Sequence, residues 1–451
     1  MKISSKIFME KLSSVQIIVL FYIIAVGIST LLLLMPVALK PGEELSFVDA
    51  LFTAASAVSV TGLSTITIAE KFSTTGMFIL TFILQFGGIG IMTLGTFIWL
   101  VMGKKIGLRE RKLIMTDQNQ STLSGLVQLM RQILFLIILI EIIGSLVLGA
   151  YLLRYYPDWP EALLHGFFMS VSATTNGGFD ITGKSLHPYA GDYFVQLVNI
   201  ILIVLGAIGF PVLIEVRHFL FRKEDTLFRF SLFTKITSTT FILLVVIGTI
   251  LIILFEYNAF FAGKSWHESF FYAFFQSVSS RSGGLSTMNV NEFTTPTLLI
   301  LCILMFIGAS PSSVGGGIRT TSLAIMMLSI FSYAKGKDTI KVFKKEILQE
   351  DILKSYIVIT TAIMICSAAV ITIAVLEPSI GLMPILFEVC SAFGTTGLSM
   401  GITSELSVAS KLVIILVMFI GRIGIFSFLF IIRGNPVKEK FHYPKERIII
   451  G

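Results

Sequence analysis

Four short segments of the chain share one arrangement of side chains. In each, a phenylalanine stands ten residues before a glycine, and an apolar residue and then Ser or Asp follow that glycine, in residues 52–64, 168–180, 274–286 and 387–399. The glycines, separated by 116, 106 and 113 residues, are Gly62, Gly178, Gly284 and Gly397. Four copies at similar spacing indicate an internal repeat rather than four unrelated turns.

The chemistry that such a repeat supports is cation coordination by backbone carbonyls. Carbonyl oxygens arranged around one axis replace the water shell of an ion, and glycine allows the backbone dihedral angles that this requires. The predicted filter residues are Val60, Thr61, Gly62, Asn176, Gly177, Gly178, Ser282, Gly283, Gly284, Thr395, Thr396 and Gly397. None of them is charged, which favours carbonyl coordination of a monovalent cation over a carboxylate ring for Ca²⁺ or a basic ring for an anion.

A second motif of small residues follows each filter glycine by 24 to 28 residues, and in the third copy it extends over residues 308–317. This stretch holds four glycines and a proline, so it cannot form regular helix in lipid. We predict a flexible loop just inside the filter, which is either a gate or a packed structural break. Its predicted gate residues are Gly308, Ser310, Pro311, Gly315, Gly316 and Gly317. We expect the corresponding spans of the other three repeats to be more continuous.

Three arginines, Arg281, Arg319 and Arg422, lie in re-entrant or membrane segments, where a charge is costly and usually faces the bundle interior or water. Arg422 occupies the small-residue motif of the fourth copy. It is predicted to be an electrostatic barrier, a latch on the carbonyls of the glycine-rich loop, or the partner of a carboxylate. Arg281, three residues before Gly284, is expected behind the filter, where it caps carbonyls or pairs with an acid such as Glu388.

The elements that must position these residues are membrane spans. The chain of 451 residues is 55% hydrophobic and only 14% charged, which excludes an ordinary soluble protein. Eight apolar runs are long enough to cross a bilayer, near residues 15–35, 76–102, 132–153, 193–215, 236–256, 297–332, 355–377 and 409–432. Four shorter runs fit re-entrant helices, near residues 46–60, 162–175, 267–281 and 383–395.

The predicted fold is an all-α polytopic membrane protein with four M1–pore helix–M2 repeats around a pseudo-fourfold pore, comprising eight transmembrane helices and four re-entrant pore loops. The repeats are expected at residues 1–103, 104–217, 218–335 with a broken second span, and 336–432, followed by a tail at 433–451. Of the 34 Lys and Arg residues, 25 lie in segments expected inside and six in the opposite loops. This bias places both termini in the cytoplasm and the basic loops near anionic lipid, rather than on nucleic acid.

Enzyme chemistry is not indicated. The sequence contains no HExxH motif, no paired-carboxylate or Ser/His/Asp constellation and no Rossmann-type glycine motif, so we expect no catalytic residues and no cofactor on this chain. The three cysteines, Cys302, Cys366 and Cys390, lie in apolar stretches and do not suggest a disulfide framework or a metal site.

The four filter glycines, the glycine-rich break and Arg422 together resemble the Trk/Ktr/HKT superfamily of potassium transporters over essentially the whole chain. The eight-span layout and the ending at residues 441–447 look most like KtrB-type membrane subunits. The resemblance implies K⁺ as the ion at the four filter glycines and K⁺ uptake across the plasma membrane, often Na⁺-stimulated. It also implies a homodimer that docks on a cytosolic KtrA-type regulatory ring, which binds ATP, ADP or NAD.

Two alternatives to K⁺ uptake stay open. Members of the superfamily with Ser at the first filter position tend to pass Na⁺, so Gly62 favours K⁺, but a Na⁺-permeable or Na⁺-coupled transporter is the alternative within the superfamily. A membrane scaffold or receptor, in which the repeat is only structural, is the alternative from a different class.

Overall fold

The computed structural model describes residues 14–90, 126–221 and 228–433, together with Met115 and four residues near the C-terminus, Pro444, Glu446, Ile448 and Ile449. Most of the basic segment predicted at 103–131 and the motif at 441–447 lie outside the described residues. The described helices follow one another as a long helix, a short helix and a second long or broken helix, and this order recurs four times.

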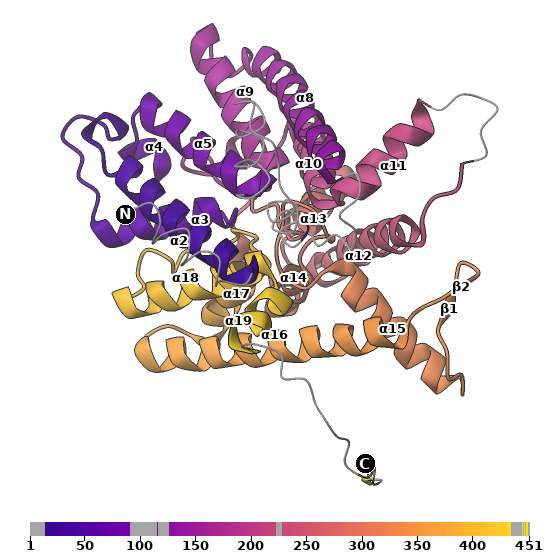
Figure 1. The fold of residues 1–451 in the computed structure, drawn as a ribbon. Coiled ribbons are helices and arrows are strands. Elements are labelled where there is room, and N and C mark those ends of the chain that lie inside the picture. Colours follow the sequence, from indigo (N-terminus) through magenta and orange to yellow (C-terminus); the bar gives the residue numbers. More distant parts are fainter. Residues whose placement is uncertain are drawn as a thin grey trace.

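The four groups lie around a common centre in chain order (Figure 1). The first contains α2 (Ser14–Leu33), α3 (Phe47–Val58), the single turn α4 (Ile68–Lys71) and α5 (Thr74–Ile89). The second contains α8 (Leu126–Leu152), α9 (Trp159–Thr174), α10 (Tyr193–Ala207) and α11 (Phe210–Leu220). The third contains α12 (Leu232–Glu256), α13 (Trp266–Ser279), α14 (Thr295–Ile307) and α15 (Thr320–Ala334). The fourth contains α16 (Gln349–Leu376), α17 (Leu382–Gly394), α18 (Val408–Ile423) and α19 (Ile425–Arg433).

The short helices α3, α9, α13 and α17 are the re-entrant helices predicted from the sequence. They have 12 to 16 residues, too few to cross a hydrocarbon core. Serines begin two of them: the Ser46 side chain accepts the N–H of Asp49, and Ser265 forms a capping box with Glu268. Each helix ends directly before one of the predicted filter segments, so its carbonyl end points at the common centre.

Four described helices, α2, α8, α12 and α16, are each long and apolar enough to cross a membrane. Their outward faces are apolar, as lipid requires: Leu31, Leu254 and Val375 are 66%, 64% and 75% exposed. The fold is therefore an all-α polytopic membrane protein, as predicted.

The second spans are less continuous than predicted. The α10–α11 and α18–α19 pairs each bend by 106°. The bends occur at Gly209 and Gly424, whose φ angles of 102° and 82° a helix cannot accommodate. Helix α5 also ends at a glycine of this kind, Gly90, with φ 97°. The third span is broken over residues 308–319 between α14 and α15, which is longer than the breaks described in the second and fourth repeats, and we call this segment the intramembrane loop.

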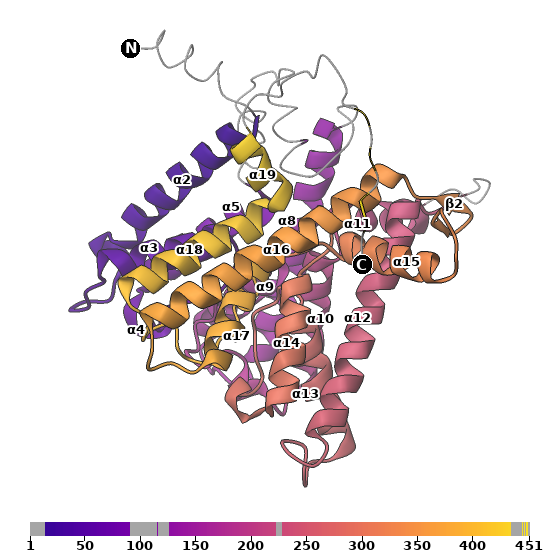
Figure 2. The same cartoon turned by 90° about the horizontal axis from the view of Figure 1, so that it is seen from below.

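The remaining regular elements are short and lie in the connections between the helices. Three 3₁₀ turns are η1 (Pro36–Ala38), η2 (His187–Tyr189) and η3 (Val290–Glu292). A small antiparallel hairpin of β1 (Lys341–Val342) and β2 (Lys345–Glu346) joins α15 to α16, with Lys341 opposite Glu346. Figure 2 shows this hairpin on the side of the molecule that also carries α11 and α19, while the loops after α13 and α17 lie on the opposite side.

Candidate functional site

The predicted filter segments have the same unusual backbone in all four repeats. Val60, Asn176, Ser282 and Thr395, each two residues before the filter glycine, have φ of 56°, 52°, 70° and 46°. The glycines themselves have φ of 92°, 68°, 71° and 96°, and the residue between has a negative φ. Because the sign of φ alternates from one residue to the next, successive carbonyl groups point toward the same side of the chain. Positive φ at non-glycine residues is costly, so its recurrence at one position in four copies marks a functional constraint.

The four filter glycines meet around one axis. A Cβ placed on Gly62 would lie 2.7 Å from the carbonyl oxygen of Gly177 and 2.8 Å from Cα of Gly178. A Cβ on Gly178 would lie 3.1 Å from Cα of Gly284 and 3.2 Å from Cα of Gly62. On Gly284 and Gly397 it would meet the carbonyl oxygens of Thr396 and Thr61. Each repeat therefore faces its neighbours through backbone alone, and any side chain at these positions would enter the shared space.

Serines on the re-entrant helices hold the filter segments from behind. The Ser56 and Ser391 hydroxyls accept the N–H groups of Gly62 and Gly397 at 3.1 and 3.0 Å. The Ser172 hydroxyl donates to the carbonyl of Phe179 at 2.6 Å, and Ser279 donates to that of Leu285. Our sequence analysis missed these serines, although a serine four residues after the phenylalanine in three of the four segments was a visible signal.

The third repeat is shifted by one residue relative to the sequence pattern. Phe52, Phe168 and Phe387 are buried, but in the third repeat the buried ring belongs to Phe275 and not to Phe274. Ser279 is then the serine four residues on, and its carbonyl accepts the N–H groups of both Gly283 and Gly284. The third filter segment is therefore one residue shorter than the spacing to Phe274 suggested.

A cavity of about 410 Å³ lies against the filter glycines of all four repeats. Its titratable lining residues, within the part of the chain that the structure describes, are Asp180, Lys184 and His187. The Asp180 carboxylate accepts the N–H and hydroxyl of Thr182 at 3.0 and 2.7 Å. Burial lowers the pKa of His187 from its ordinary value. The cavity forms a vestibule on the side where the filter segments continue into loops.

The intramembrane loop lies against the other end of the filter. The N–H of Gly316 donates to Oγ1 of Thr395 at 2.7 Å. A Cβ on Gly315 would lie 2.7 Å from Oγ of Ser282. The loop is also bonded to the second spans of its neighbours, through Val314 N–H to Gly206 and Gly317 N–H to Gly421, both at 3.2 Å. These bonds hold the loop across the centre, directly beneath two filter segments.

Arg422 connects the fourth repeat to this loop and to the first repeat. Its guanidinium donates to the carbonyl oxygens of Val314 and Gly87, and to that of Gly88 at 3.4 Å. Of the three roles predicted for Arg422, these bonds fit the latch best, because one side chain fixes the loop to a neighbouring span.

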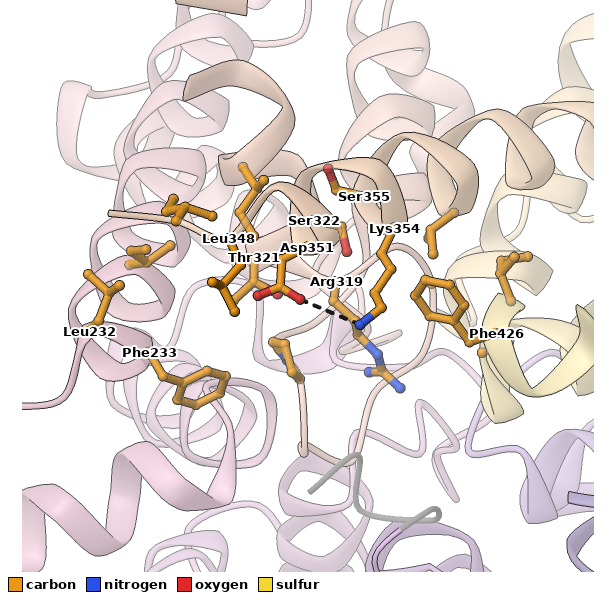
Figure 3. Close-up of a pocket in the computed structure, with 18 of the residues that line it drawn as sticks. Leu232, Phe233, Arg319, Thr321, Ser322, Leu348, Asp351, Lys354, Ser355 and Phe426 are labelled. Atoms are coloured by element: carbon orange, nitrogen blue, oxygen red, sulfur yellow. Dashed lines mark ion pairs between the residues drawn. The ribbon is translucent and has the colours of Figure 1, made fainter. Parts of the chain in front are cut away.

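A second arginine, which our sequence analysis did not assign to the gate, also holds the loop. Nη1 of Arg319 donates to the carbonyls of Ser310 and Gly315, the former at 3.4 Å. Arg319 directs its side chain into a cavity of about 580 Å³ that Pro311 and Gly317 of the loop also line (Figure 3). Lys354, paired with Asp351 at 3.6 Å, points into the same space. The cavity lies between α12, α15, α16 and α19, and it leaves room beside the loop.

No group of His, Cys, Asp and Glu in the described ranges has the arrangement of a metal site. The chemistry that the site offers is that of backbone carbonyls around an axis, with a non-helical loop and two arginines at one end. This arrangement can replace the water shell of a monovalent cation and can close the path behind it.

Comparison with known proteins gives one consistent family. The model of the TrkH family, described as cation transport protein, matches residues 3–441. The crystal structure of the potassium transporter TrkH from Vibrio parahaemolyticus superposes with a TM-score of 0.73 at 19% identity, covering 94% of this chain and 85% of that one. At this identity the match shows a shared fold.

Two relatives come from Bacillus subtilis (strain 168). Ktr system potassium uptake protein D is 57% identical over 442 residues, 98% of each chain. Ktr system potassium uptake protein B is 34% identical over 440 residues, 97% of this chain and 96% of the relative. The potassium/sodium uptake protein NtpJ of Enterococcus hirae is 32% identical over the full length of both chains.

Proposed function

Because this chain belongs to the TrkH family of cation transport proteins, a family of membrane transporters and not of enzymes, we propose that it takes up K⁺ as the ion-translocating subunit of a Ktr-type system. K⁺ is the transported ion, and the chain itself uses no cofactor. The two Bacillus subtilis relatives are named as potassium uptake proteins of Ktr systems, and both match over nearly their whole length, which supports this proposal.

The observation that carries the proposal is the convergence of the four filter glycines on one axis. The carbonyl oxygen of Thr61 lies where a Cβ on Gly397 would be placed, and that of Thr396 lies where a Cβ on Gly284 would be placed. The axis is therefore lined by oxygen atoms and not by side chains. Such a lining compensates K⁺ for its lost water, and sites made of neutral dipoles are weak enough to release the ion again. We propose Gly62, Gly178, Gly284 and Gly397 as the K⁺-binding filter, with channel-like permeation.

In this proposal the intramembrane loop is the gate. It lacks helical hydrogen bonds of its own, and it is held by Arg422, Arg319 and the Thr395 hydroxyl. Releasing these bonds lets the loop move into the 580 Å³ cavity beside it, which clears the path below the filter.

A regulatory partner is part of the same proposal. The name "Ktr system" of both Bacillus subtilis relatives implies more than one component. We propose a homodimer in the plasma membrane, with both termini and the basic segments in the cytoplasm. A KtrA-type ring that binds ATP, ADP or NAD would dock there and shift the loop between its two states.

The proposal is tested with the purified protein in liposomes. The liposomes are loaded with K⁺, so that the outward K⁺ gradient drives the entry of ⁸⁶Rb⁺. Uptake of ⁸⁶Rb⁺ is measured with and without a tenfold excess of external Na⁺. We expect Rb⁺ uptake that K⁺ competes with and Na⁺ does not inhibit. If neither the liposomes nor a K⁺-transport-deficient host that expresses the protein shows uptake, K⁺ transport is excluded. A membrane scaffold or receptor would then be the remaining alternative.

A Na⁺-permeable transporter is the second candidate, since the Enterococcus hirae relative is named as a potassium/sodium uptake protein. The same liposomes separate the two when ²²Na⁺ replaces Rb⁺. ²²Na⁺ uptake that equals Rb⁺ uptake would favour this candidate. Stimulation of Rb⁺ uptake by Na⁺, without ²²Na⁺ entry, would support Na⁺-stimulated K⁺ uptake.

A further inference from the structure

Two fully buried charges of opposite sign lie behind the filter on neighbouring repeats. Arg281 is 0% exposed and Glu388 is 1% exposed. The sequence predicted that Arg281 caps carbonyls or pairs with an acid such as Glu388, but among the described residues its guanidinium bonds neither a carbonyl nor Glu388. Burial of a charge without a counter-charge costs folding free energy. Because no opposite charge neutralises it, its electric field reaches other groups in the low-dielectric interior.

Glu388 lies behind the outer end of the fourth filter segment. Its two carboxylate oxygens accept the hydroxyls of Ser399, at 2.8 Å, and Thr403. Both hydroxyls belong to residues that line the vestibule. The two hydroxyls stabilise the ionised carboxylate against the cost of its burial, because each can donate a hydrogen bond to one oxygen. Glu388 therefore directs negative charge toward the vestibule end of the filter.

Arg281 lies at the inner end of the third filter segment. It follows the last residues of α13 and directly precedes Ser282, which the intramembrane loop approaches. None of its guanidinium nitrogens has a hydrogen-bond partner among the described residues. The group lies 5.5 Å from the ring centre of Phe241 on α12. A cation–π contact stabilises the charge without neutralising it.

The other repeats show that this arginine is not required by the local fold. The corresponding positions hold Ser59, Thr175 and Gly394. The Ser59 and Thr175 hydroxyls donate to carbonyls of Ala55 and Val171 on their own helices. Three repeats thus form their filter segment without a charge, and only the third places a cation at the carbonyl end of its re-entrant helix, where it offsets the helix dipole.

We propose that Glu388 and Arg281 form a fixed electrostatic gradient along the filter, which strengthens cation binding at the vestibule end and weakens it at the loop end. Arg281 occupies the position that Gly394 holds in the fourth repeat, and Glu388 lies six residues before Gly394, so the two charges differ in depth by about 9 Å along a re-entrant helix. A charge about 10 Å from a bound ion, at an effective dielectric constant near 20, changes the affinity for that ion by about tenfold. A cation from outside is captured at the first site and released at the last one.

This inference rests on the proposed K⁺ pathway, so the wild-type protein is measured first. K⁺ is titrated into the purified full-length protein by isothermal calorimetry in choline buffer, and Rb⁺ uptake is measured in liposomes. A wild type that neither binds nor carries K⁺ would remove the proposed function. The gradient would then be tested with Na⁺ in the same two assays.

The variants are chosen to change charge and not shape. Glu388→Gln should weaken K⁺ binding about tenfold, because the amide keeps the size and a hydroxyl acceptor but loses the charge. Arg281→Met should tighten K⁺ binding by a similar factor, and the double variant should return close to the wild type. Arg281→Lys keeps the charge and should bind like the wild type, whereas a purely structural arginine would not be rescued.

A matched control is Glu256→Gln. Glu256 is also 0% exposed and accepts the N–H and hydroxyl of Thr294, at 2.8 and 2.7 Å, but neither residue lines the vestibule. This variant should lose stability without changing K⁺ affinity. The gradient is overturned if Glu388→Gln and Arg281→Met shift affinity in the same direction or not at all. It is equally overturned if Arg281→Lys behaves like Arg281→Met, or if Glu256→Gln weakens K⁺ binding as much as Glu388→Gln.

Discussion

The backbone N–H of Gly316 donates to Oγ1 of Thr395 at 2.7 Å, so the intramembrane loop is attached directly to the filter segment of the fourth repeat. Thr395 itself adopts the left-handed conformation, with φ 46° and ψ 53°. This is uncommon for a β-branched residue. The loop therefore cannot leave its position without breaking a bond to the residue that shapes the filter.

Removing this hydroxyl should loosen the loop. Thr395→Val has the same shape but cannot accept the Gly316 N–H, which leaves a buried donor unsatisfied at a cost of about 1–3 kcal/mol to the closed state. We expect Rb⁺ uptake by the protein alone, without any partner, to rise by about tenfold. Thr395→Ser keeps the acceptor and should resemble the wild type. Equal uptake by Thr395→Val and wild type would mean that this bond does not hold the gate.

The filter glycines should determine selectivity. Gly62→Ser combines a disfavoured φ of 92° with a Cβ that would lie 2.7 Å from the carbonyl of Gly177. The filter must then shift, and we expect a loss of K⁺ preference over Na⁺ of about tenfold or more in competition assays. The same direction is expected for Gly178, Gly284 and Gly397. Unchanged discrimination in all four Gly→Ser variants would reject the filter assignment.

Gly42 offers a matched control for backbone strain. Its φ is 84°, close to that of Gly62, but a Cβ there has nothing within 4 Å. Gly42→Ser should therefore cost about 1 kcal/mol of stability, as any residue in a left-handed conformation does, and leave ion selectivity unchanged.

Acidification should reduce uptake through His187. Burial lowers the pKa of this side chain, so it is neutral at pH 7 and becomes charged only as the pH falls below its ordinary value of about 6.5. Protonation adds a second positive charge beside Lys184 in the vestibule and repels the entering cation. The wild type should lose uptake as the pH falls below about 6.5, while His187→Gln should lose less. Parallel pH profiles of the two proteins would contradict this role.

Much of the fold was predictable because it depends on local properties. Apolar runs of span length and shorter runs between them are set by bilayer thickness, and the predicted spans and re-entrant helices correspond to α2, α3, α8, α9 and their later equivalents. The position of the intramembrane loop was also predictable, since ten residues with four glycines cannot remain helical in lipid.

Contacts between repeats were harder to predict. A glycine in a small-residue motif allows a close approach or a bend, and only the packed structure shows the 106° bends at Gly209 and Gly424. The one-residue shift to Phe275 and the lack of a pair between Arg281 and Glu388 depend on which side chains become buried together. The cavity at Arg319 arises from four helices far apart in the chain, so no local pattern indicated it.

Filling that cavity should oppose gate opening. Ser322 and Ser355 line it from α15 and α16. Ser322→Phe or Ser355→Phe places a ring in the space that the loop would enter, so we expect Rb⁺ uptake to fall several-fold with K⁺ over Na⁺ selectivity unchanged. Ser322→Ala is the small control and should transport like the wild type. Normal uptake by both Phe variants would show that the loop opens in another direction.

Releasing the loop from Arg422 should have the opposite effect. Arg422→Ala removes the donors to Val314 and Gly87, which join three parts of the bundle. Deletion of residues 315–317 removes the loop segment that touches Ser282 and Thr395. We expect either change to raise Rb⁺ uptake by about tenfold and to reduce its dependence on a regulatory subunit.

Arg422→Lys separates the charge from the bonding geometry. A lysine keeps the positive charge in the pathway but cannot span both carbonyls with one planar group. If Arg422 is a latch, Arg422→Lys should behave like Arg422→Ala. If it is an electrostatic barrier, the lysine variant should keep the low uptake of the wild type. Should the deletion fold normally and leave uptake and regulation unchanged, the loop would be only a structural break and the gate would lie elsewhere.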